Sequence, residues 1–172
     1  FDGPKLLATV HALCEAGANV KAIDKDGMTP LHDAAHAGAI KVVEYLVSKG
    51  KSFNHATLKE LIILYVGALV NSVAPRSRGT GVGYGSTPLM RAYGCKDKER
   101  LEIVTFLLKN GADVNVLDEF GDSALSLFAS TEDIKSMAVL LDYGADPNVT
   151  GHDGSNAISV AIIRNNKSMG TL

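Results

Sequence analysis

The chain has 172 residues, of which 46% are hydrophobic, so it is long enough to bury a core of ordinary size. Its formal net charge of −2 lacks the basic excess that attracts nucleic acids and anionic membranes, and no apolar run approaches the roughly 18 residues of a membrane span. We therefore expect neither nucleic acid binding nor membrane insertion. Two cysteines, Cys14 and Cys95, make no disulfide framework, which favours a reducing compartment: the cytoplasm, or alternatively the nucleus.

Residues 1–23 predict one helix and the turn that ends it. Pro4 can open the helix, Leu6, Val10 and Leu13 share an apolar face, and Gly17 can end it. We expect this helix to be the back half of a two-helix unit whose first helix is absent. Because the chain begins with phenylalanine rather than methionine, we also expect it to be part of a longer protein. The alternative, that this helix is the natural end of the fold, stays open.

Residues 24–56 have the clearest pattern, a turn followed by two short helices. Thr29 can cap the first helix, and Pro30 suits its first position, where a missing N–H costs nothing. Gly38 separates the two helices and Gly50 ends the second. The apolar positions recur at helical spacing in both helices: Leu31, Ala34 and Ala35, then Ile40, Val43, Leu46 and Val47. One such unit cannot bury its own apolar faces, so it should recur along the chain.

Residues 57–84 interrupt the pattern. Thr57 and Glu60 form a capping box, and an apolar, buried helix should follow as far as Val73. In place of a second helix stands 74–84, a stretch with the composition of a mobile loop. Its glycines alternate at 79, 81, 83 and 85, which differs from the spacing of the dinucleotide fingerprint, and no P-loop lysine follows. We therefore expect a flexible insertion and no phosphate site.

Three further units follow the interruption. Thr87, Pro88 and Leu89 restart the pattern, with Met90 where the earlier unit has His32, and the connection between its two helices, around 95–98, should be longer. The next two units begin with Ser123 and Asn156, which can cap helices as threonine does. The last one stops before a second helix can be recognised.

Glycines at equivalent positions set the period of these units. Three pairs are each 33 residues apart: Gly17 and Gly50, Gly111 and Gly144, Gly121 and Gly154. With this period and the Thr-Pro-Leu-His-x-Ala motif at residues 29–34, the chain resembles the ankyrin-repeat family everywhere except about 57–81. The resemblance implies an all-α solenoid of stacked helix-turn-helix units with projecting turns, one of them degenerate with an inserted loop. The single domain 1–172 would comprise repeats at about 1–23 (partial), 24–56, 57–81 (degenerate, with the loop), 82–117, 118–150 and 151–172 (partial).

The sequence gives little support for a catalytic site or a metal site. His32 and His36 are spaced like the histidines of the zinc-protease motif, but Asp33 stands where that motif needs a glutamate, and no third ligand is evident. The family resemblance instead gives His32 a hydrogen bond with Thr29. No serine nucleophile elbow and no Cys–His pair can be identified. We therefore expect no catalytic residues, no metal, no cofactor and no enzyme activity.

The resemblance implies a protein-binding surface on the concave face and the turn tips. Carried over by register, its residues are Lys25, Asp26, Met28, Tyr84, Ser86, Glu119, Phe120, Asp122, His152, Asp153 and Ser155 on the turns, and His36, Ala37, Ser130, Thr131 and Arg164 on the first helices. Met28 and Phe120 are notable because a projecting turn offers an apolar side chain no core. Apolar anchors among polar residues are typical of a binding hot spot.

We therefore expect a monomeric, non-catalytic module that binds another protein, one with a basic rim around an apolar pocket. The alternative is the targeting or regulatory segment of a larger protein, such as an enzyme, a channel or a pathogen effector acting in host cytosol.

Overall fold

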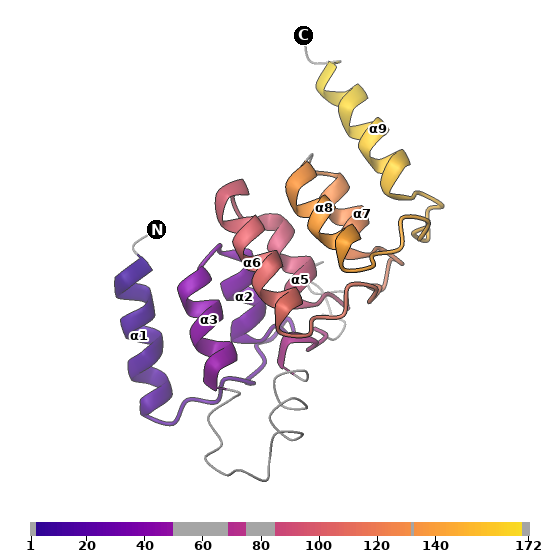
Figure 1. The fold of residues 1–172 in the computed structure, drawn as a ribbon. Coiled ribbons are helices and arrows are strands. Elements are labelled where there is room, and N and C mark those ends of the chain that lie inside the picture. Colours follow the sequence, from indigo (N-terminus) through magenta and orange to yellow (C-terminus); the bar gives the residue numbers. More distant parts are fainter. Residues whose placement is uncertain (1–2, 50–68, 75–84, 132, 170–172) are drawn as a thin grey trace.

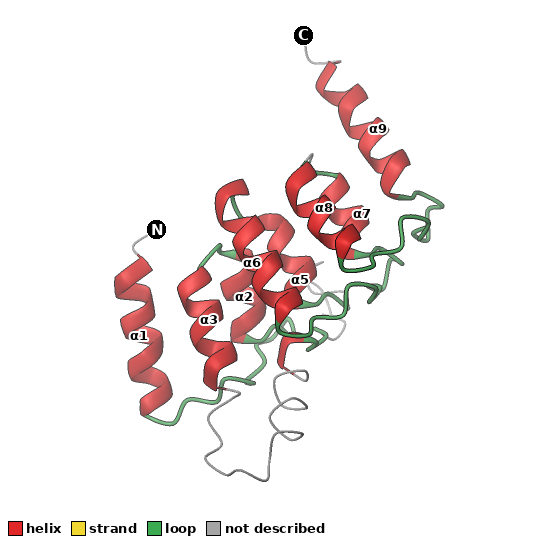
Figure 2. Ribbon diagram, viewed as in Figure 1, coloured by secondary structure: helices red, strands yellow, loops and turns green. Residues whose placement is uncertain are grey.

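The computed structural model describes residues 3–49, 69–74, 85–131 and 133–169 (Figures 1 and 2). Within these ranges all regular structure is helical, apart from single bridges between Leu117 and Ser123 and between Thr150 and Asn156. The helices are α1 (Gly3–Glu15), α2 (Pro30–His36), α3 (Ile40–Lys49), α5 (Pro88–Arg91), the 3₁₀ helix η1 (Ala92–Gly94), α6 (Asp97–Lys109), α7 (Ala124–Ala129), α8 (Ile134–Asp142) and α9 (Ala157–Met169).

The helices stack in two layers. Helices α2, α5, α7 and α9 form one layer and α1, α3, α6 and α8 the other, with each helix packed on its neighbours (Figure 1). The pairs α2–α3, α5–α6 and α7–α8 are complete units, α1 lies beside α3 as a lone second helix, and α9 lies beside α7 as a lone first helix. This confirms the predicted all-α solenoid.

The core lies between the two layers. Its largest buried side chains come from every complete unit: Leu31, Leu46, Leu89, Ile103, Leu107, Leu125, Phe128 and Leu140. Burying each contributes about 1.5–3 kcal/mol relative to leaving it in water. No single unit could bury these faces alone, so the stack stabilises the units.

Three first helices, α5, α7 and α9, begin with the polar cap that the sequence predicts, whereas at α2 the Thr29 hydroxyl pairs with His32 Nδ1 and accepts no backbone N–H. The Thr87 Oγ1 accepts the N–H of Met90 (3.3 Å), and the Ser123 Oγ accepts the N–H of Ser126 (3.2 Å). Asn156 Oδ1 accepts the N–H of Ser159 in the same way (3.0 Å). These bonds satisfy amides that a helix N-terminus leaves without partners.

The turns before the first helices share one hydrogen-bond pattern. Asp118 accepts the N–H of Gly121 (3.0 Å) and donates its own N–H to the Asp122 carbonyl (3.0 Å). Ala74 makes the same pair of bonds with Gly85 (2.9 Å) and Ser86 (3.0 Å). Between Ala74 and Gly85, however, lie ten residues, 75–84, where the Asp118 turn has two. Ala74, Gly85 and Ser86 therefore pair as the base of such a turn. The loop predicted in place of a second helix, 74–84, lies outside the described residues except for Ala74.

The units on either side of the interruption are adjacent. Helix α2 packs directly on α5, and α3 packs on α6. In addition, His32 Nε2 donates to the Ser86 carbonyl (2.9 Å). Among the described residues, no further helix pair lies between these two units, and the degenerate repeat predicted at 57–81 stays a prediction. Most of that segment, including the capping box and most of the predicted helix, lies outside the described residues, so the repeat boundaries there stay predictions.

Two local predictions also differ from the structure. Helical backbone ends at Val70, three residues before Val73, whose side chain is exposed. The extra residues between α5 and α6 do not lengthen a loop; they extend α6, which begins at Asp97 and has 13 residues against 10 in α3. Three added residues are close to one helical turn, so they can join the helix without changing the face it buries.

Candidate functional site

The turns before α2, α7 and α9 emerge at the same end of the helix stack, opposite the short connections within each helix pair (Figure 2). The turn 118–122, before α7, is held by a single carboxylate. Asp118 Oδ1 accepts the N–H groups of Phe120 (2.8 Å) and Asp122 (2.9 Å), while Gly121 adopts φ +77°, which few other residues tolerate. Burial raises the pKa of Asp118 above its ordinary value, against the lowering effect of these bonds. The turn thus holds Phe120 with 49% of its surface exposed.

The turn 151–155, before α9, lies against the turn 118–122. The His152 N–H donates to the Phe120 carbonyl (2.6 Å), and a Cβ added to Gly121 would lie 3.1 Å from the His152 ring. Between the two turns is a cleft of about 410 Å³ lined by Phe120, Asp122, His152 and Asp153. We call these four residues the turn cleft. All four are among the predicted binding residues, and the fold brings them together from two units.

The two carboxylates of the turn cleft are positioned by hydroxyl groups and amides. Asp122 Oδ1 accepts from Ser126 Oγ (3.2 Å). Asp153 Oδ1 accepts the N–H (2.8 Å) and the hydroxyl (2.5 Å) of Ser155, and these bonds lower the pKa of Asp153. In each carboxylate, Oδ1 therefore accepts hydrogen bonds from a residue of its own unit. Within the described part of the chain, neither forms a salt bridge with lysine or arginine.

In the turn 24–28, before α2, fewer of the predicted binding residues are exposed. Lys25 is exposed and Asp26 is half-buried, but Met28 is 3% exposed, so its prediction as an exposed anchor is wrong. Met28 follows Gly27, and its carbonyl accepts the N–H of Asp24 at the base of the turn (3.0 Å). At the base, unlike the tip, the fold can bury an apolar side chain, and burying methionine contributes about 2 kcal/mol.

The second turn is only partly described. Ser86 is half-buried; its carbonyl accepts from Ala74 and His32, and its hydroxyl is enclosed without a hydrogen bond. Ser86 is therefore part of the contact between units more than of an open surface. Tyr84 lies outside the described residues, so its place in the binding surface stays a prediction.

The predicted first-helix residues take several roles. His36 is exposed and its ring covers Gly94 of the next unit. The hydroxyls of Ser130 and Thr131 donate to the carbonyls of Leu127 (2.6 Å) and Phe128 (2.7 Å), so both half-buried residues terminate α7. Ala37 is exposed just beyond α2, and Ser155 is half-buried on its turn. Arg164 lies on α9, but its side chain is outside the described part.

His32 is fully buried, and both its ring nitrogens are used. Nδ1 accepts the Thr29 N–H (3.1 Å) and lies 2.8 Å from the Thr29 hydroxyl, while Nε2 carries the proton that it donates to Ser86. Burial lowers the pKa of His32 to about 4, which keeps the ring neutral near pH 7. The Thr29–His32 bond that the family resemblance implies is thus present, and the second bond, from His32 to Ser86, joins two units.

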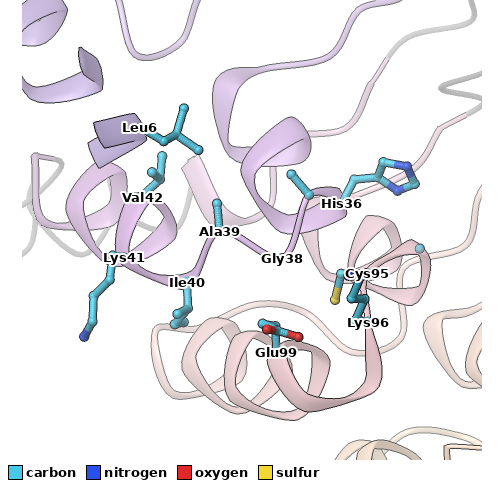
Figure 3. A pocket seen from close by; sticks show the side chains of 12 residues that line it. Leu6, His36, Gly38, Ala39, Ile40, Lys41, Val42, Cys95, Lys96 and Glu99 are labelled. Atoms are coloured by element: carbon cyan, nitrogen blue, oxygen red, sulfur yellow. The ribbon is translucent and has the colours of Figure 1, made fainter. Parts of the chain in front are cut away.

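A second cleft, of about 420 Å³, lies at the other end of the helices (Figure 3). Ala39 of the α2–α3 connection and Ile40 at the start of α3 lie on one side of it, and Cys95 and Glu99 on the other (Figure 3). Burial raises the pKa of Cys95 to about 11, so this thiol is a poor nucleophile despite His36 at the rim. The sequence analysis missed this cleft; its only trace is the three extra residues that extend α6 to form the wall at Glu99.

No helix in the described ranges is both long enough and apolar enough to cross a bilayer. Within the same ranges, no group of three or more histidine, cysteine, aspartate or glutamate side chains is arranged to hold a metal ion.

Comparison with known proteins gives one family. A model described as "Ankyrin repeats (3 copies)" matches residues 5–57 and 89–172. Over 138 residues the chain is 27% identical to transient receptor potential cation channel subfamily A member 1 of Drosophila melanogaster, an alignment that covers 74% of this chain and 11% of the channel. Over 125 residues it is 29% identical to L-asparaginase of Dirofilaria immitis, covering 69% of this chain and 21% of that protein. The chain thus spans a minor part of each relative.

Proposed function

The chain belongs to the ankyrin-repeat family, whose members are generally protein-interaction modules and typically not enzymes, and we propose that this one binds a partner protein through its turn tips and concave face. The turn cleft carries this proposal. It combines an aromatic ring that is half exposed with two carboxylates from different units. An aromatic anchor surrounded by polar groups is the usual form of a binding hot spot.

The charge of the turn cleft indicates the kind of partner. Asp122 and Asp153 flank Phe120, and Glu119 is exposed beside it. A partner with a basic rim around an apolar pocket would therefore match both properties of this surface. The charges would chiefly speed association, while burial of Phe120 would slow dissociation.

The second candidate function is the targeting or regulatory segment of a longer protein. It is supported by the two relatives, which are named as a cation channel and an L-asparaginase. Each matches this chain over a minor part of its own length. What such different proteins share is expected to be a recognition module and not an activity. The two candidates are compatible, because a regulatory segment of this kind would also act by binding protein.

The Phe120→Ala variant tests the proposed binding surface. We expect nearly unchanged thermal stability, because about half of the side chain is already in water, and binding weakened by about 2 kcal/mol or more. The measurement is affinity purification from cells of the source organism with quantitative mass spectrometry, followed by affinities for the purified partner. Ile134→Ala is the matched control, since Ile134 is 78% exposed at the start of α8, away from the turns. If both variants bind like the parent, the interface lies elsewhere.

A further inference from the structure

We propose that the turn cleft receives an arginine side chain of the partner. This inference rests on the proposed function and names the group that the cleft selects. Carboxylates alone would make an ordinary hydrated turn. Here they share a cleft of about 410 Å³ with a half-exposed aromatic ring.

The balance of charge in the turn cleft favours a cation. Asp122 and Asp153 both line it, Asp118 begins the turn that holds Phe120, and His152 is the one basic side chain in the lining. Oδ1 of each lining carboxylate accepts a hydrogen bond within its own unit, and among the described residues Oδ2 of neither carboxylate accepts one. A cation entering the cleft therefore finds acceptors from two units.

Phe120 favours arginine over lysine. A guanidinium is planar, can lie flat on an aromatic ring, and presents five N–H donors in a fixed arrangement. Stacked on Phe120, it could donate to carboxylates on both sides. A lysine ammonium is more strongly hydrated and offers a point charge with no plane to stack.

The turn cleft exists only because two units are held in register. The His152 N–H bond to the Phe120 carbonyl and the close approach of His152 to Gly121 set the two turns against one another. The cleft is therefore preformed, and an arginine entering it need not order a loop.

The test uses small probes and the full chain. N-acetyl-arginine amide, N-acetyl-lysine amide and N-acetyl-citrulline amide, which is isosteric with arginine but uncharged, are titrated while backbone amide NMR shifts are followed. We expect the arginine probe to shift the amides of residues 119–122 and 152–155, with the citrulline probe about tenfold weaker. Equal shifts from arginine and citrulline, equal shifts from arginine and lysine, or shifts confined to other regions would overturn the inference.

Two variants assign the effect to this cleft. Asp153→Asn keeps an oxygen that can accept the Ser155 bonds, yet it should remove most of the preference for arginine over citrulline. Asp142→Asn changes net charge equally at an exposed position on α8 and should leave the preference intact. An equal loss in both variants would indicate general charge attraction and contradict the proposal. If Phe120→Ala abolishes partner binding while the probes show no arginine preference, this inference fails and the proposed function stands. If Phe120→Ala has no effect on partner binding, the proposed function fails.

Discussion

At the scale of single residues, side chains of three different types make the same hydrogen bond at four helix starts. His32, Met90, Ser126 and Ser159 each stand three residues after a helix cap and accept the backbone N–H of that cap, through Nδ1 (3.1 Å), Sδ (3.4 Å), Oγ (3.0 Å) and Oγ (2.7 Å) respectively. The sequence predicted the caps at Thr87, Ser123 and Asn156, and the family resemblance implied the Thr29–His32 bond. It did not reveal that sulfur could replace the ring nitrogen, because this depends on side-chain conformation.

His32 should make stability depend on pH. Its pKa falls from the ordinary 6.5 to about 4 in the folded chain, so between these values the unfolded chain binds a proton that the folded chain does not. The free energy of unfolding should therefore fall as pH decreases from 6.5 to 4, by about 3 kcal/mol in all.

The variant that tests this is His32→Met, which copies Met90. Near pH 7 it should cost about 1–2 kcal/mol, because the bond to the Ser86 carbonyl is lost. Urea unfolding at several pH values should show this difference shrinking toward pH 4. His36→Ala, at an exposed site, should change little. A difference that stays constant with pH would mean that His32 is not held neutral by burial.

Phe120 and Met28 show how far the position of a residue in a turn predicts the exposure of its side chain. Both were predicted to project from turns. Phe120 is two residues after Asp118, at the tip, and it is exposed; Met28 is at the base of its turn, directly before the cap, and it is buried. The difference between tip and base is set by hydrogen bonds at each turn, which the residue types alone do not specify.

At the scale of elements, asparagines join successive units. Asn115 Nδ2 donates to the Gly144 carbonyl (3.0 Å), and Oδ1 accepts the Asp146 N–H (2.9 Å). Asn71 makes the same two bonds with Gly111 (2.9 Å) and Asp113 (2.7 Å). This equivalence places residues 69–74 at the start of the α5–α6 unit. The glycine period could not show it, because the ten residues 75–84, inserted after Asn71, shift the register.

The Asn115→Ala variant should lower the free energy of unfolding by about 1–2 kcal/mol. It removes two solvent-exposed hydrogen bonds that join neighbouring units. Asn148→Ala is the matched control: Asn148 lies 33 residues further on, and its side chain makes no such bond within the described residues. Chemical denaturation of both variants provides the measurement. Equal losses would mean that the asparagine acts inside its own turn and not between units.

At the scale of the whole molecule, the stack follows from a repeated pattern. The 33-residue period, the caps and the apolar stripes were enough to predict the all-α solenoid, because each unit needs its neighbours to bury its apolar face. The turn cleft is a product of the stacking. Its four residues could be named from their register, but their meeting in one cleft depends on the contact between turns 118–122 and 151–155.

The most direct test of the account is amide hydrogen exchange of the full chain with and without its partner. If the turn tips bind, exchange should slow in peptides covering 118–123 and 150–156 on complex formation. It should stay unchanged in α3 and α6, whose outer faces lie away from the turns. Protection confined to α3, α6 or α8, with both turns exchanging as in the free chain, would contradict the proposal that this protein recognises its partner through its turns.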